Sequence, residues 1–126
     1  MQLSKLRAKD IMITEVLTIT PDARVAIARL KMLRNNIGAL PVIEKGKLVG
    51  IITHRDTSLI DPDSLLLKVR DIMSKNVVTI TKETTLKEIA KIMKQTRFQR
   101  IPVVKNGKLV GLITQSCVIN AIANYL

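Results

Sequence analysis

The sequence predicts an α+β fold of two β-α-β-β-α repeats packed sheet to sheet about a pseudo-two-fold axis. The 126-residue chain matches itself at one constant offset of 61 residues, without a gap. Each copy shows the same order of strand and helix patterns. Three strands and two helices leave one sheet face uncovered, and a second copy covers it. The repeated segments are 10–12 and 71–73, 18–20 and 79–81, 41–42 and 102–103, 46–50 and 107–111, and 52–53 and 113–114.

Each copy is expected to begin with a strand and a helix. Residues 16–19 and 77–80 are short runs rich in β-branched residues, which predicts strands. Thr85 and Glu88 have the spacing of a capping box, so a helix is expected to begin between them. The positions assigned to its buried face are Leu86, Ile89, Ala90 and Met93 in copy two and Val25, Ala28, Arg29 and Met32 in copy one.

A hairpin and a second helix complete each copy. Residues 40–43 and 48–52 flank a turn at 44–46, and the equivalent turn in copy two contains Asn106-Gly107, a strong hairpin signal. A second helix is expected after Thr53 and after Thr114. Asp and Pro at residues 61–64 mark a turn between the copies. The predicted boundaries are 8–60 for repeat one, 61–68 for the linker and 69–121 for repeat two.

Composition excludes several classes of protein. One cysteine and one histidine leave no intrachain disulfide, no thiolate zinc site and almost no material for a histidine-based catalytic triad, so we expect no enzyme and no metal site. No apolar run approaches the length of a membrane span, and no signal-type segment follows the first residues, so we expect a cytoplasmic protein without membrane contact. The net charge of +11 leaves nucleic acid as a possible partner.

The repeated motifs resemble a known family. Asp-Ile-Met, Thr-Ile-Thr-Pro-Asp, Ile-Gly-Ala-Leu-Pro-Val and Gly-Lys-Leu-Val-Gly-Ile-Ile-Thr with a following Arg-Asp are similar to a CBS domain. The two copies, over residues 8–121, resemble a CBS pair, or Bateman module. The resemblance implies a regulatory module without catalysis or an obligatory cofactor. It also implies an adenosyl effector (AMP, ADP, ATP or S-adenosylmethionine) in the cleft between the copies, and a homodimer that forms a disc of four CBS units.

The segment 50–56 supplies the groups that a nucleotide needs. A carboxylate at Asp56 can accept both ribose hydroxyls, the Thr53 hydroxyl can donate to phosphate, and Arg55 adds positive potential. The family resemblance assigns these roles to Thr53 and Asp56. It further implies base contacts and a phosphate contact from across the cleft. The complete predicted ligand set is Ile51, Thr53, Arg55, Asp56, Asn76, Val77, Val78, Phe98, Arg100 and Thr114.

Copy two departs from the pattern at one position. Thr114 matches Thr53, but Cys117 stands where copy one has Asp56. A thiol cannot hold a ribose diol as a carboxylate does. We therefore expect the second cleft to bind weakly, to bind a different compound, or to stay empty.

Simpler interpretations remain open for several of these residues. Thr53 and Asp56 also fit a plain helix cap, Phe98 a core residue and Arg100 a surface charge. Cys117 fits a small buried residue. A second apolar line on the first helix points to a homodimer contact or to packing against the C-terminal helix; it consists of Ile27, Leu30 and Leu33.

The function of the module also has alternatives. The triplet His54-Arg55-Asp56 matches a kinase catalytic loop, but Asp61 stands where that loop needs Asn, and no glycine-rich loop is present. A basic nucleic-acid-binding module would explain the charge, although no helix-turn-helix or zinc-finger motif occurs. A scaffold without any ligand is the third possibility. The adenosyl sensor that signals to a partner protein is the primary prediction.

Overall fold

The computed structural model describes residues 2–58 and 60–125, and these form two compact units. The central unit is continuous and comprises Leu17–Val77. The terminal unit combines Met1–Val16 with Val78–Leu126. None of the helices in the described residues has the length and apolar character needed to cross a lipid bilayer.

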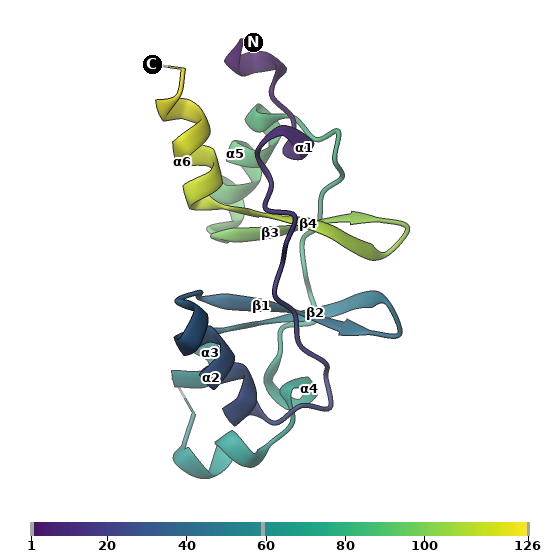
Figure 1. Ribbon diagram of the computed structural model, residues 1–126, viewed down its shortest axis with the longest axis vertical. Coiled ribbons are helices and arrows are strands. Elements are labelled where there is room, and N and C mark those ends of the chain that lie inside the picture. The colour runs from purple at the N-terminus through teal and green to yellow at the C-terminus, as the bar shows by residue number, and fades with distance from the viewer. Residues whose placement is uncertain (1, 59, 126) are drawn as a thin grey trace. The chain divides into compact units, whose positions relative to one another are not determined.

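The two units contain equivalent elements, and in each the helix, the hairpin and the second helix follow in the predicted order (Figure 1). In each, the two principal helices lie on one face of a β-hairpin. This arrangement confirms the α+β class. The elements of the central unit are α2 (Val25–Asn35), β1 (Ala39–Glu44), β2 (Lys47–Thr53), α3 (His54–Ser58), η2 (Pro62–Leu66) and α4 (Val69–Ile72). Those of the terminal unit are η1 (Leu3–Lys5), α1 (Ala8–Ile11), α5 (Leu86–Thr96), β3 (Arg100–Lys105), β4 (Lys108–Thr114) and α6 (Gln115–Ala123).

Both hairpins form as predicted. Strands β1 and β2 pair antiparallel, as do β3 and β4, and each pair closes with a two-residue turn. Both residues of each turn have positive φ, 51° and 77° at Lys45 and Gly46, and 54° and 79° at Asn106 and Gly107. Positive φ at both positions defines the type I′ turn, whose twist matches that of the strands and which favours Asn-Gly.

The strands predicted at 16–19 and 77–80 do not form. Each segment makes one isolated parallel bridge, Ile19 to Val42 and Ile80 to Val103. The Ile19 N–H donates to the Pro41 carbonyl at 3.1 Å, and the Ile43 N–H donates to the Ile19 carbonyl at 2.9 Å. The next bond of a parallel ladder would need an N–H from residue 41, which is proline and has none. Pro102 occupies the same place in the other unit, so both ladders stop after one bridge.

The helices form as predicted, but three residues assigned to their buried faces are not buried: Arg29 and Met93 are half-buried, and Ala90 is exposed. Val25, Ala28 and Met32 are fully buried in the central unit. Thr85 caps α5 as expected, since its Oγ1 accepts from the Glu88 N–H at 3.2 Å. Leu86 and Ile89 are buried.

The segment that leads into each sequence repeat packs on the body of the other repeat. In the terminal unit, Ile13 bridges to Leu112; in the central unit, Ser74 bridges to Ile51. Leu6 and Ala8 belong to the core of the terminal unit, and Val69 to that of the central unit. Each compact unit therefore combines the leading segment of one sequence repeat with the remainder of the other.

Two equivalent glycines allow this close packing. A Cβ on Gly50 would lie 2.7 Å from Met73 Sδ and 2.8 Å from the Ser74 carbonyl oxygen. A Cβ on Gly111 would lie 2.5 Å from Met12 Sδ and 3.1 Å from the Ile13 carbonyl oxygen. In each unit the repeated Met thus packs directly on the repeated Gly, a position where only a residue without a side chain fits.

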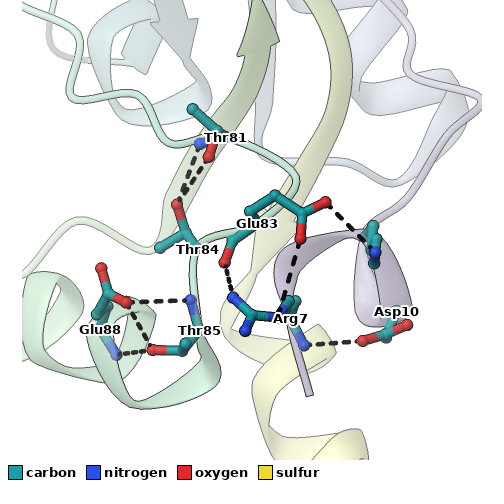
Figure 2. A network of polar contacts seen from close by, with 8 residues as sticks. Arg7, Asp10, Thr81, Glu83, Thr84, Thr85 and Glu88 are labelled. Atoms are coloured by element: carbon teal, nitrogen blue, oxygen red, sulfur yellow. Dashed lines mark hydrogen bonds and ion pairs between the residues drawn. The ribbon is translucent and has the colours of Figure 1, made fainter. Parts of the chain in front are cut away.

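Ion pairs fasten the leading segments at equivalent positions. Figure 2 shows Arg7 and Glu83 in the terminal unit, where Arg7 Nη1 also donates to the Glu83 carbonyl at 2.6 Å. In the central unit, Arg70 Nη2 lies 2.6 Å from Asp22 Oδ1 and 3.3 Å from Glu44 Oε2. The Arg70 hydrogen bond lowers the pKa of the Asp22 carboxyl below its usual range. Such exposed pairs orient a segment more than they stabilise it.

Candidate functional site

Thr53 and Asp56 form a reciprocal pair at the junction of β2 and α3. The Asp56 N–H donates to Thr53 Oγ1 at 3.1 Å, and the Thr53 N–H donates to Asp56 Oδ2 at 2.9 Å. The last residue of the strand thereby caps the helix, and the carboxylate reaches back to the strand. This is the logic of a capping box. Thr53 and Asp56 therefore do form a helix cap, as the simpler interpretation predicts.

The cap leaves polar capacity unused. Among residues 2–58 and 60–125, Asp56 Oδ1 has no hydrogen-bond partner, and the Thr53 hydroxyl hydrogen has no acceptor. No buried side-chain oxygen or nitrogen in that part of the chain lacks a partner, so Oδ1 is open to solvent. The junction therefore offers one ionised acceptor and one hydroxyl donor, both held in place by their second bonds.

The equivalent junction of β4 and α6 offers different chemistry. Thr114 Oγ1 accepts from the Cys117 N–H at 3.2 Å, as Thr53 does from Asp56. Cys117 Sγ lies 3.2 Å from the same Oγ1. The threonine keeps its place as the cap, but a neutral thiol replaces the carboxylate. Sulfur is a weak acceptor, so this junction lacks a strong group for a diol.

The structure brings six of the predicted ligand residues into the central unit. Ile51 exchanges two backbone hydrogen bonds with Ser74, at 2.9 and 3.0 Å. This bridge is antiparallel, so the chain from Ser74 through Asn76 and Val77 runs in the direction opposite to β2 and away from its junction with α3. Arg55 is exposed on α3, whereas Ile51, Thr53, Asp56 and Val77 are half-buried.

The other predicted residues lie in the terminal unit. Arg100 and Thr114 are directly paired across the β3–β4 hairpin, so Arg100, the second cation of the set beside Arg55, lies next to the junction that contains the thiol. Arg100 is half-buried, with Nη1 only 3.5 Å from Gln99 Oε1, at the limit of a hydrogen bond. Phe98 is 44% exposed, which rules out the alternative that it is a plain core residue. Val78 and Thr114 are half-buried.

A hollow in the central unit was not predicted from the sequence. It has a volume of about 340 Å³ and lies between the end of α2 and the start of α3. Its lining residues are Met32, Leu33, Asn36, Ile37, Gly38 and His54. The repeat itself pointed to these residues. At the offset of 61, residues 36–38 are equivalent to 97–99, which include the predicted ligand residue Phe98.

Comparison with known families identifies the repeat. The family described as CBS domain matches residues 8–57 and again residues 69–124. The chain is a CBS-domain protein. Its two CBS repeats account for most of its length, and CBS domains are regulatory rather than catalytic modules. Among the described residues, no group of three or more His, Cys, Asp or Glu side chains is placed to hold a metal ion.

Curated relatives place this CBS pair in two contexts. It is 42% identical over 109 residues to an inosine-5′-monophosphate dehydrogenase of Korarchaeum cryptofilum, covering 86% of this chain and 22% of that enzyme. The CBS pair thus spans about a fifth of the length of that relative and matches only its CBS part. It is 32% identical over 108 residues to the CBS domain-containing protein YhcV of Bacillus subtilis, covering 83% of this chain and 77% of that protein.

Solved structures of CBS pairs match the fold closely. CBSX2, solved in complex with AMP, has a TM-score of 0.87 at 26% identity, covering 94% of this chain and 97% of that one. The CBS pair of MJ0100, solved with 5′-methylthioadenosine and S-adenosyl-L-methionine, has a TM-score of 0.85 at 25% identity, covering 96% and 98%. The CBS protein ATU1752 of Agrobacterium tumefaciens has a TM-score of 0.83 at 31% identity, covering 93% and 99%.

Proposed function

We propose that this CBS pair senses one adenosyl compound per chain, such as AMP, ADP, ATP or S-adenosylmethionine, and passes the signal to a partner protein. The observation that carries the proposal is the Thr53–Asp56 pair, in which Oδ1 of Asp56 remains free beside a hydroxyl donor. Relatives of the same fold bind AMP or sulfonium and thioether adenosines. The feature common to those ligands is the adenosine, whose ribose diol needs an acceptor.

In this proposal the repeats (8–60 and 69–121, joined by 61–68) pack sheet to sheet, and the ligand lies in the cleft between them. Asp56 accepts from the ribose hydroxyls, and Thr53 and Arg55 act on the phosphate. Arg100 reaches the phosphate from the other repeat. The base slot is formed by Ile51, Asn76, Val77, Val78 and Phe98. Thr114 belongs to the second, weaker cleft, where Cys117 replaces the carboxylate.

We also propose that the signal involves a homodimer. Ile27, Leu30 and Leu33 on α2 are 53%, 43% and 58% exposed, which is unusual for three large apolar side chains on one helix. A second copy of the chain would bury them. A ligand changes such an assembly only as far as it binds one arrangement better than the other.

The test is calorimetric titration of AMP, ADP, ATP and S-adenosylmethionine into wild type and two matched variants. Asp56→Ala removes a capping carboxylate at the proposed site. Asp71→Ala removes an equivalent one elsewhere, where Asp71 Oδ2 accepts from the Lys68 N–H at 3.0 Å. Charge-assisted bonds contribute about 1.5–3 kcal/mol each, so Asp56→Ala is expected to weaken binding about a hundredfold.

Asp71→Ala should bind as wild type does, and both variants should stay folded by circular dichroism, because a lost cap costs only about 1 kcal/mol. Unchanged affinity in Asp56→Ala would mean that Asp56 is only a cap. Equal losses in both variants would mean that the effect comes from folding. No binding of any of the four compounds to wild type would favour the ligand-free scaffold.

A further inference from the structure

The adenosyl site does not account for the positive charge, which is concentrated in the terminal unit. That unit carries 11 Lys and Arg residues against 4 Asp and Glu, while the central unit carries 10 against 6. Three of the four acids are already engaged: Asp10 accepts from the Arg7 N–H, Glu83 pairs with Arg7 and Lys9, and Glu88 caps α5. Glu88 stays ionised next to Lys87, but the unit as a whole still has 11 cations against 4 anions.

Part of this charge forms a row on α5. Lys87, Lys91 and Lys94 follow the i, i+4, i+7 spacing that places side chains on one face of a helix. All three are exposed, and none has an ion-pair partner within residues 2–58 and 60–125. The row extends about 10 Å along the helix axis. Leu86 and Ile89, on the opposite face, are buried in the core of the unit.

The same face of α2 is apolar. At the offset of 61, Lys87, Lys91 and Lys94 correspond to Ala26, Leu30 and Leu33. Two helices with the same fold and the same packing therefore present opposite surfaces. The row on α5 is a property of this helix and not of the repeat.

We propose that the α5 lysine row binds the phosphate backbone of a nucleic-acid duplex, without reading its sequence. Lysines are point charges that contact single phosphates, whereas base reading favours the bidentate geometry of arginine. A row of about 10 Å spans roughly three phosphates of one strand. With Phe98 and Tyr125 as the only aromatics, the chain cannot offer the stacked rings that a single strand uses. An anionic membrane is disfavoured, because the apolar face of α5 is already buried and cannot insert.

The experiment is fluorescence anisotropy of a labelled DNA duplex of about 20 base pairs, titrated at several salt concentrations between about 50 and 200 mM. It compares wild type with the triple variant Lys87→Gln, Lys91→Gln and Lys94→Gln. A control of equal charge, Arg34→Gln with Lys45→Gln and Lys75→Gln, removes three exposed cations of the central unit. Circular dichroism checks the fold, and Lys91→Gln alone replaces the triple variant if that one is misfolded.

We expect the α5 variant to bind at least about tenfold more weakly and to lose about three units of the log–log salt slope, or about one unit for Lys91→Gln alone. The control should change far less. The α5 variant should still bind AMP as wild type does, which separates this proposal from the adenosyl site. No duplex binding by wild type at about 50 mM salt would overturn it. So would equal losses in both triple variants, or binding to phosphatidylserine vesicles without binding to the duplex.

Discussion

Thr53 and Thr114 end equivalent strands, and each caps the helix that follows with its hydroxyl. Three residues on, one junction has a carboxylate with a free oxygen, and the other has a thiol 3.2 Å from the threonine. The helices α2 and α5 also differ at equivalent positions: the exposed face is apolar in α2 and cationic in α5. The two repeats thus share their backbone and hydrogen-bond framework, while their exposed and half-buried side chains differ in charge and polarity.

The largest expected effect comes from giving the second junction the missing carboxylate. Cys117→Asp should raise the number of AMP molecules bound per chain from one to two, because the Thr114 hydroxyl and the helix start are already in place. An affinity gain of about a hundredfold at that site, or about 2.7 kcal/mol, is expected. Calorimetry gives both numbers. Cys117→Asn, similar in size but uncharged, is the control and should gain much less; if Cys117→Asp still binds one AMP, the two junctions differ by more than this side chain.

The glycine contacts test whether the shared framework is equally tight in both units. Gly50→Ala places a methyl group 2.8 Å from the Ser74 carbonyl oxygen, and this backbone atom can move only with its segment. Overpacking of this kind costs about 1–3 kcal/mol, so the free energy of unfolding in urea should fall by that amount. Gly111→Ala should cost less, because the nearest backbone atom, the Ile13 carbonyl oxygen, lies at 3.1 Å and the closer Met12 side chain can move. Shortening the sulfur side chain with Met73→Ala should not rescue Gly50→Ala, and a full rescue would show that Met73 alone sets the constraint.

Arg100 probes the terminal unit's contribution to the proposed site. Arg100→Ala should weaken AMP binding about tenfold, or about 1.4 kcal/mol, because it removes a phosphate partner. Adenosine binding should hardly change, since adenosine has no phosphate. Titration of both compounds measures the difference, and an equal loss for the two would mean that Arg100 acts through packing against Thr114.

The smallest effect concerns the ion pairs of the leading segments. Arg70 lowers the pKa of Asp22 in the folded state, so this pair favours folding above the usual carboxyl pKa and stops doing so as pH falls through the lowered value. Arg70→Ala should return the pKa of Asp22 toward its usual range. Lys68→Ala should move it less, because Lys68 Nζ is 3.9 Å from Asp22 Oδ1 and Arg70 Nη2 only 2.6 Å. NMR titration of the Asp22 carboxyl distinguishes the two variants, and a larger shift in Lys68→Ala would reverse the order.

Local sequence signals predicted the elements that local chemistry determines. Asn106-Gly107 and the Thr85–Glu88 capping box act over a few residues, so the turn and the helix start followed directly from the sequence. The segments at 16–19 and 77–80 have strand composition, but whether a ladder forms depends on the partner strand, where Pro41 and Pro102 end it. Ile51, Thr53, Arg55 and Asp56 lie at one junction because they are neighbours in the sequence, whereas the hollow lined by 36–38 and His54 depends on how α2 packs beside α3, which no local signal encodes.

The terminal unit is built from two segments that are far apart in the sequence, and this affects the order in which the two units can fold during synthesis. The central unit is one continuous segment, so it can close as soon as Val77 has left the ribosome. The terminal unit joins the first residues to the last ones, and Arg7 bonds to a partner 76 positions along the chain. The apolar Leu6 and Ala8 therefore stay unpaired until their backbone partners Leu86 and Thr84 have been made, and Ile13 until Leu112 has been made. A chain that ends before residue 82 would lack these partners, expose Leu6 and Ala8, and still contain every residue of the central unit.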